Sequence, residues 1–279
     1  GVAHADWVSV LHHGGTVVPS APRSMPGPDE RVPSLPPTAR QRRGGHTVHS
    51  EPVHDYAFFT AFQPVVALES GEVVGYEALS RFADGQSPLA GLAEAMAAGL
   101  GVELDSELAR TAVAGARKLP EAHWLAVNLS VELAGRPDIV GDLARNANRP
   151  LVVELDGDDA ALEALVDALA ALPNVQVAID DDGVGYETMS RIERLRPAFV
   201  KLHRETVADL ESDVARQAAV RSLVEFAEQH GCTVVAEGVE TAGERDALLA
   251  TGVLFGQGYF IGRPLPVDRL ATPVAAAAR

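Results

Sequence analysis

Polar residues recur at the ends of the β-rich runs in this sequence, and most of them are types that bind metal ions. Seven of eight such runs carry polar residues at or near the C-terminal end: Glu77, Asn128, Glu154, Asp180 with Asp181, Lys201, Glu237 with Glu240, and Gln257. A charged side chain in the middle of a buried strand would cost several kcal/mol of desolvation. Recurrence in strand after strand therefore predicts one shared site.

The predicted site would contain six carboxylates, two amides and one lysine. Carboxylates crowded together repel one another and take up protons unless positive charge offsets them. Oxygen ligands without Cys or His favour Mg²⁺ or Mn²⁺ over zinc or copper. Two such ions could clamp a phosphate and lower the pKa of a bound water, which is the chemistry of a phosphodiesterase. A carboxylate that is not a ligand could accept the proton of that water, and Lys201 could orient the water or a phosphate oxygen.

The segments that must position these residues alternate between β-rich and helical patterns from Tyr56 onward. Apolar residues at helical spacing stop at Pro173 in one segment and at a capping Gly231 in another. Eight β-rich runs with helices between most of them predict an α/β fold, a TIM-like (β/α)8 barrel of about 220 residues. The C-terminal ends of all strands converge on one face of such a barrel, so even Glu77 and Gln257 would meet. An open doubly wound sheet is the alternative architecture.

Composition narrows the class of protein. The chain has 279 residues, of which 47% are hydrophobic, and 23 basic against 39 acidic residues give a net charge of -16. This balance argues against a partner such as polymeric nucleic acid, while a small anionic ligand that enters with cations remains compatible. No apolar run approaches the roughly 18 residues of a membrane span and no secretory signal is recognisable, which predicts a cytoplasmic protein. A single cysteine, Cys232, cannot form an internal disulfide.

Both ends of the chain differ from its body. Residues 1–52 are rich in Pro, Arg and His and have no helical or strand periodicity, which predicts a disordered leader. A solvated leader is favoured over a metal site because its histidines are scattered and no cysteine accompanies them. Residues 53–270 are then the folded domain, and residues 271–279 are a short Ala-rich tail.

Seven motifs, in order, resemble those of the EAL domain, the cyclic-di-GMP phosphodiesterase family: YEALSRF, VNLS, VVELD, AIDDDGVGY, VKLHRETV, VVAEGVET and GQGYFIGRPLP. The resemblance covers about residues 56 to 268. It implies a modified TIM barrel whose first strand runs antiparallel to the rest. It also implies hydrolysis of one phosphodiester bond of cyclic di-GMP, which gives linear pGpG, with two Mg²⁺ or Mn²⁺ ions as cofactors. A homodimer is the assembly that the family suggests.

The resemblance further implies a role for each matching residue. Ligands of the first metal would be Glu77, Asn128, Glu154 and Asp180, while Asp181 would bind the second metal. Lys201 would contact the water and Glu237 would be the general base. Further residues of the metal and substrate site would be Glu240 as a metal ligand and Gln257 as a substrate contact, and the nucleotide would also contact Gln63, Leu79 and Arg81.

The sequence also departs from the family pattern around one loop. The segment reads DDDGVGYET where the family commonly reads DDFGTGYSS, so Asp182, Val184 and Glu187 stand at changed positions. Gly157 replaces a glutamate that usually steadies this loop, and His203 replaces an acidic residue near the site. In the family the loop helps to position the second metal and the dimer contact, so these changes bear on turnover and pairing more than on ligand binding.

Two functions are compatible with these residues. The first is an active, metal-dependent phosphodiesterase that lowers the level of cyclic di-GMP, which the full set of metal and base residues favours. The second is a catalytically weak receptor that binds cyclic di-GMP and signals to a partner protein, which the altered loop favours.

Overall fold

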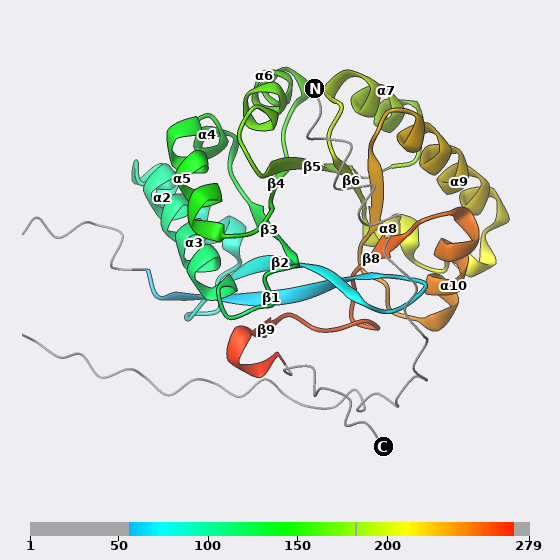
Figure 1. Ribbon diagram of the computed structural model, residues 1–279, viewed down its shortest axis with the longest axis horizontal. Helices are drawn as coiled ribbons and strands as arrows, with labels where there is room; N and C mark the ends of the chain where they lie inside the picture. Colours follow the sequence, from blue (N-terminus) through cyan, green and yellow to red (C-terminus); the bar gives the residue numbers. More distant parts are fainter. Residues whose placement is uncertain (1–55, 182, 271–279) are drawn as a thin grey trace, which may run out of the picture. The chain divides into compact units, whose positions relative to one another are not determined.

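The eight β-rich segments of the sequence form the strands of one closed barrel (Figure 1). The computed structural model describes residues 56–181 and 183–270, so the predicted leader and Ala-rich tail lie outside the described residues. The strands are β1 Phe58–Ala67, β2 Val73–Phe82, β3 Trp124–Asn128, β4 Leu151–Leu155, β5 Val175–Asp181, β6 Phe199–Leu202, β7 Thr233–Ala236 and β8 Phe255–Gly256, and a short β9, Leu265–Pro266, follows them.

The barrel is closed by its first strand. From β2 to β8 each strand pairs in parallel with the next, whereas β1 pairs antiparallel with both β2 and β8. The predicted barrel and its antiparallel first strand are therefore confirmed, and the open doubly wound sheet is wrong. Parallel order from β2 onward brings the C-terminal ends of seven strands to one face.

Helices surround the strands on the outside of the barrel (Figure 1). Apolar residues at spacings of three and four bury one face of each long helix, as with Leu162, Val166 and Leu169, all at most 3% exposed. The α-helices are α2 Pro88–Ala97, α3 Gly101–Ala116, α4 Val131–Ala134, α5 Pro137–Ala147, α6 Asp159–Ala170, α7 Tyr186–Leu195, α8 Arg204–Val207, α9 Val214–Gln229 and α10 Ala242–Thr251, and two 3-10 turns span Leu210–Ser212 and Val267–Arg269.

The last barrel strand is much shorter than the apolar run that contains it. Only Phe255 and Gly256 pair as β8, although the run extends to Gly262. Gly258 explains the early end, because its backbone packs directly on that of Val239: a Cβ added at Gly258 would lie 2.1 Å from the Val239 nitrogen. Val239 N donates to Gln257 O at 3.0 Å, which joins the loops after β7 and β8.

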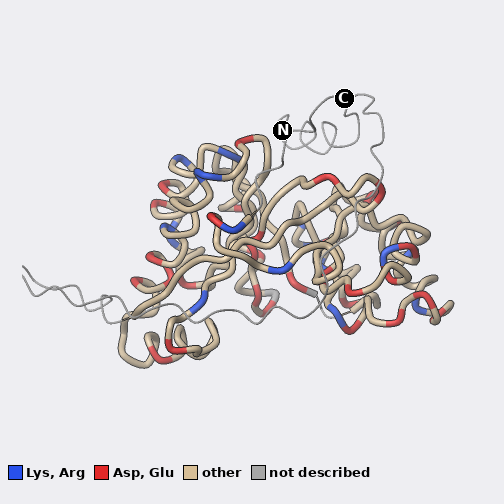
Figure 2. The backbone as a smooth tube through the Cα atoms, turned by 90° about the horizontal axis from the view of Figure 1, so that it is seen from below, with Lys and Arg blue, Asp and Glu red and all other residues tan. Residues whose placement is uncertain are grey.

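Charge is spread over the described part of the chain. Figure 2 shows acidic and basic positions interspersed along its helices and loops. Within residues 56–181 and 183–270, no helix combines the length and apolarity that a membrane-spanning segment needs.

Candidate active site

Strand periodicity brings charged side chains into the barrel. Successive residues of a strand point to opposite faces, so a residue between two core-facing neighbours points the other way. The flanking core residues in three strands are Tyr76 and Ala78 around Glu77, Val153 and Leu155 around Glu154, and Val200 and Leu202 around Lys201. The three charged residues are nevertheless only 4 to 5% exposed, because they lie inside the ring of strands.

Lys201 is the centre of this interior group. Its Nζ lies 2.5 Å from Glu237 Oε1 and 2.8 Å from Glu154 Oε2. Glu77 Oε1 and Asp180 Oδ1 follow at 3.6 Å and 3.8 Å. One ammonium group thus faces four carboxylates from β2, β4, β5 and the end of β7.

Two amide side chains complete the group. Asn128 Nδ2 donates to Glu77 Oε1 at 3.0 Å, and Gln257 Nε2 donates to Glu77 Oε2 at 2.5 Å. Gln257 Nε2 also lies 3.2 Å from Glu237 Oε1. We call the full set the lysine cluster: Glu77, Asn128, Glu154, Asp180, Lys201, Glu237 and Gln257.

Burial and mutual repulsion shift the pKa values of the carboxylates. Burial raises the pKa of Glu154 well above its usual value, and the neighbouring Glu77 raises it further against the pull of Lys201. Burial also raises the pKa values of Asp180 and Glu237, which Lys201 only partly opposes. Burial acts on Glu77 in the same sense, but Lys201 and the amide donors outweigh it and lower the pKa of Glu77.

The lysine responds in the opposite direction. Burial alone favours its neutral amine, yet the surrounding carboxylates raise the pKa of Lys201 well above its usual value. Lys201 therefore carries a positive charge at neutral pH and faces four acidic side chains.

The donor chemistry of the cluster fits divalent cations. Asp180 Oδ1 is buried without a hydrogen-bond partner among the described residues, and Lys201 Nζ lies 3.8 Å from it. Every side chain of the cluster except Lys201 has an oxygen atom that could bind a cation, and hard cations such as Mg²⁺ and Mn²⁺ prefer oxygen ligands. Among the described residues, no three His, Cys, Asp or Glu side chains are already arranged as a metal-binding group. Lys201 lies between the carboxylates and holds them around its own charge.

One of the four predicted nucleotide contacts, Gln257, follows β8, and the other three lie on the two strands that carry Gln63 and Glu77. These two residues are directly opposite in the β1–β2 register. Gln63 Nε2 donates to Gly262 O at 3.0 Å, which ties β1 to the loop after β8. Leu79 and Arg81 follow on β2, where Arg81 Nη1 donates to Ser80 O at 2.8 Å. Their contact with a nucleotide stays a prediction.

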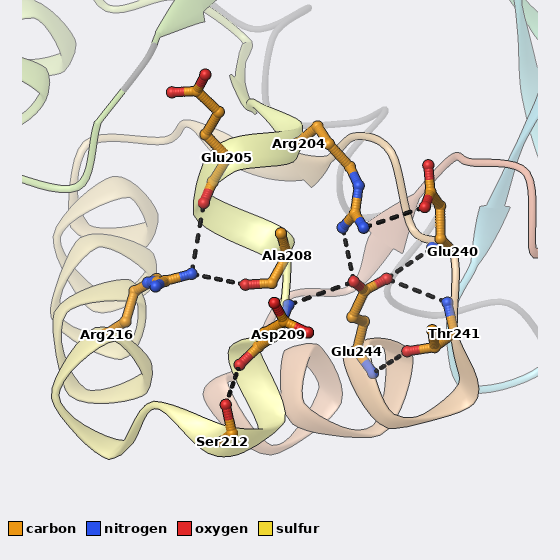
Figure 3. Close-up of polar contacts among 9 residues, drawn as sticks. All are labelled: Arg204, Glu205, Ala208, Asp209, Ser212, Arg216, Glu240, Thr241 and Glu244. Carbon is orange, nitrogen blue, oxygen red and sulfur yellow. Dashed lines mark hydrogen bonds and ion pairs between the residues drawn. The ribbon is translucent and has the colours of Figure 1, made fainter.

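Two predicted metal ligands are not part of the cluster as described. Glu240 lies outside it, with its carboxylate 3.1 Å from Arg204 Nη2 (Figure 3). Asp181 pairs through its backbone with Leu202, but its side chain lies outside the described residues, as does Asp182. Roles of Glu240 and Asp181 at a metal stay predictions.

Sequence reasoning missed two residues that brace the site. Arg191 on α7 donates to Asp180 O at 3.1 Å and to Gly157 O at 3.4 Å, and no spacing signal distinguishes it from a surface arginine. Glu244 is 2% exposed and accepts hydrogen bonds from the backbone of Glu240 and Thr241. A capping-box pattern, Thr241 followed by Glu244 three residues later, was visible in the sequence as a signal for Glu244.

Comparison with known proteins identifies the relatives of this barrel. The EAL domain family model matches residues 49–264. The bifunctional diguanylate cyclase/cyclic di-GMP phosphodiesterase MucR of Pseudomonas aeruginosa is 31% identical over 233 residues, which cover 77% of this chain and 34% of MucR. The chain spans about a third of the length of the curated relatives that match it first.

Solved structures agree with the sequence comparison. A PaMucR phosphodiesterase in a c-di-GMP complex is 29% identical with a TM-score of 0.66, and the match covers 77% of this chain and 99% of that one. A manganese/cy-diGMP complex of Klebsiella pneumoniae BlrP1 at pH 6 is 32% identical with a TM-score of 0.66, over 80% of this chain and 58% of that one. Because the family model covers most of the sequence and these barrels superpose on it, the chain belongs to the EAL domain family.

Proposed function

We propose that this domain is a metal-dependent phosphodiesterase that hydrolyses cyclic di-GMP to linear pGpG. The observation that carries the proposal is the lysine cluster, in which two buried and two partly buried carboxylates share one ammonium group. An oxygen-rich site with four acidic side chains suits two divalent cations and, through them, a phosphodiester. MucR and BlrP1, the relatives described above, are a named cyclic di-GMP phosphodiesterase and a protein solved with cyclic di-GMP.

The ligands of the cations would come from the ends of neighbouring strands. Glu77, Asn128, Glu154 and Asp180 would hold the first Mg²⁺ or Mn²⁺, with Asp181 at the second and Glu240 as a further ligand. Bound cations of this kind polarise a phosphate and lower the pKa of a water.

The remaining side chains would handle the proton and the nucleotide. Glu237 would accept the proton of the attacking water, and its raised pKa makes it a stronger base than an exposed glutamate. Lys201, 2.5 Å from Glu237, lowers the pKa of this carboxylate against the effect of burial and would orient a phosphate oxygen. Gln257 would fix both Glu237 and Glu77, while Gln63, Leu79 and Arg81 would contact the nucleotide on the β1–β2 side.

Incubation of the full chain with cyclic di-GMP and Mn²⁺, followed by chromatography of pGpG, tests this proposal. We expect turnover that a chelator abolishes and that Glu77→Ala reduces by at least about 100-fold, since that residue would hold a cation. The matched control is Glu72→Ala, an exposed glutamate just before the same strand, which should leave turnover unchanged. Turnover that survives Glu77→Ala would contradict the site assignment.

A catalytically weak receptor for cyclic di-GMP is the second candidate. The observation that favours it is the loop after β5, whose sequence departs from the family at Val184 and Glu187 and whose neighbour Gly157 offers only its carbonyl to Arg191. Isothermal titration with cyclic di-GMP decides between the two. Tight binding without metal-dependent turnover would support the receptor.

The proposal includes a homodimer. The family's loop after the fifth strand contributes to the dimer contact, and this is the loop that differs here. Sedimentation of the full chain with and without cyclic di-GMP measures the assembly directly, and a monomer under both conditions would contradict this part of the proposal.

A further inference from the structure

A second group of charged residues joins the loops that follow β6 and β7, outside the lysine cluster (Figure 3). Its central carboxylate is Glu244, which is 2% exposed and accepts four donors. Glu244 Oε2 accepts the backbone N–H groups of Glu240 at 2.6 Å and Thr241 at 3.1 Å. Glu244 Oε1 accepts from Arg204 Nη1 at 2.6 Å and from the Asp209 backbone at 3.4 Å.

A helix cap accounts for only part of this arrangement. The capping box of α10 needs one oxygen of Glu244 on the Thr241 backbone and the Thr241 hydroxyl on the Glu244 backbone. The other oxygen points to Arg204, at the start of α8 in a different loop. Burial raises the pKa of Glu244, but the backbone donors and Arg204 outweigh it, so the carboxylate stays ionised.

Arg204 holds both sides of the segment that follows β7. Its Nη2 reaches Glu240 at 3.1 Å while its Nη1 reaches Glu244. Its aliphatic part crosses Gly238, where an added Cβ would lie 2.5 Å from Arg204 Cδ. Gly238 also has φ +65, so a side chain there would be strained as well as obstructed. A glycine at position 238 therefore leaves the space that the Arg204 side chain occupies.

The spacing relates this outer contact to the lysine cluster. Arg204 follows Lys201 by three residues, and Glu240 follows Glu237 by three residues. Both segments leave the adjacent parallel strands β6 and β7, whose register pairs Leu202 with Ala236. The inner pair is Lys201 with Glu237 at 2.5 Å, and the outer pair is Arg204 with Glu240 at 3.1 Å. Both pairs therefore connect the segments that follow β6 and β7.

We propose that Arg204 and Glu244 are positioning residues that fix the Glu237 carboxylate against Lys201. This inference rests on the proposed phosphodiesterase function, in which Glu237 accepts a proton. Neither residue belongs to the lysine cluster, although both contact Glu240. They act by holding the backbone of residues 237–241 in register with the end of β6, so that Glu237 stays in contact with Lys201.

Turnover with separate kcat and KM tests the inference. Arg204→Gln and Glu244→Gln should each lower kcat about 10- to 100-fold, because a displacement of about 1 Å at a base has effects of this size. KM for cyclic di-GMP should change less than about twofold, because the predicted nucleotide contacts Gln63, Leu79 and Arg81 are on β1 and β2. The kcat of the double variant should be no lower than that of the poorer single variant, since each substitution breaks the same Arg204–Glu244 contact. Arg204→Lys should recover part of kcat through its remaining charge.

The matched control is Arg216→Gln (Figure 3). Arg216 braces the same α8 segment, with Nη1 donating to Ala208 O at 2.6 Å and a 3.1 Å ion pair to Asp213, and these partners lie outside residues 237–241. A loss of general stability in this region would affect this control too. Its kcat should stay within about twofold of the wild type.

Hydrogen exchange gives a readout that does not depend on activity. Amides of residues 237–241 should exchange at least about tenfold faster in Arg204→Gln and Glu244→Gln than in the wild type or Arg216→Gln, measured without added metal on folded protein. Unchanged exchange and unchanged kcat in both variants would overturn the inference, as would an equal effect of Arg216→Gln. If the wild type has no turnover, the proposed function fails alone, and the exchange result decides whether the contact positions the loop.

Discussion

Lys201 is the residue on which the interior of this barrel depends. A lysine that is 4% exposed and within 3.8 Å of four carboxylates does two things at once. It removes part of the repulsion among the acids, and it lowers the pKa of Glu237 against the larger effect of burial. Removal of its charge would leave several carboxylates buried without a counter-ion.

Lys201→Met should therefore destabilise the metal-free protein by about 3–5 kcal/mol at pH 7.5, the range for breaking a buried ion pair from one side. Glu154, Asp180 and Glu237 have raised pKa values, so the folded state takes up protons more readily than the unfolded state as the pH falls. The loss of unfolding free energy in Lys201→Met should be smaller at pH 5.5 than at pH 7.5. Denaturant unfolding at both pH values in the presence of a chelator measures it.

An exposed lysine provides the comparison. Lys118 pairs with Asp268 at 2.8 Å, with side chains 61% and 75% exposed, so Lys118→Met should change stability by less than about 1 kcal/mol. That small change should be the same at both pH values. A deficit for Lys201→Met that grows on acidification would contradict the assigned directions of the pKa shifts.

Among the elements, the two loops after β7 and β8 are held together by backbone contacts. Phe260 N donates to Val239 O at 2.9 Å, and Val239 N donates to Gln257 O. Gly258→Ala places a methyl group about where the Val239 backbone lies, so we expect a loss of at least about 1–3 kcal/mol, typical of overpacking, together with reduced turnover. Gly135→Ala is the control, because its added Cβ would be 3.4 Å from the nearest atom. Equal denaturation midpoints for the two variants would refute this interpretation.

The end of the barrel opposite the site has its own buried charge. Arg149, just before β4, is 5% exposed and donates to the carbonyl oxygens of Leu119, Pro120 and His123 at 3.0 to 3.4 Å. Burial lowers the pKa of Arg149, but its value is high enough for the charge to persist. Loss of the guanidinium leaves buried acceptors unsatisfied.

Arg149→Met should cost about 2–4 kcal/mol of unfolding free energy for this reason, with little effect on cyclic di-GMP binding. Arg145→Met tests the alternative that any arginine in this region matters, since Arg145 is 71% exposed and pairs only with Asp142 among the described residues. Chemical denaturation and nucleotide titration of both variants provide the measurement. A stable Arg149→Met protein would show that water satisfies these carbonyls.

Sequence patterns predicted some elements better than others for physical reasons. Strand β4 is a continuous apolar run with Glu154 near its C-terminal end, so the sequence indicated that Glu154 belongs to a site at that end of the barrel. The length of β8 could not be predicted in this way, because it depends on the contact of Gly258 with Val239, far away along the chain. Glu240 was expected beside the metal ligands, yet its position depends on Arg204, a long-range partner that no local pattern reveals.

For the whole molecule, cation binding should appear as stabilisation, since a ligand that binds only the folded state raises the unfolding free energy. At about 100 times the dissociation constant, Mn²⁺ should add about 2.7 kcal/mol, or roughly 5–10 °C in Tm for a domain of this size. Glu154→Gln should abolish the shift because it removes a central oxygen ligand. Differential scanning fluorimetry with NaCl at matched ionic strength is the control, and an equal shift with NaCl would exclude a specific site.

The short ladder between β1 and β9 has a mechanical consequence. Ala61 pairs with Pro266 and Phe62 with Leu265, so the polypeptide enters and leaves the barrel on adjoining rungs of one strand. The next residue along that strand, Gln63, is opposite Glu77. Force applied to either end of the described domain would therefore load β1 first, next to the acidic residues. A linker that joins the two ends would leave the strand pairings of the barrel unchanged.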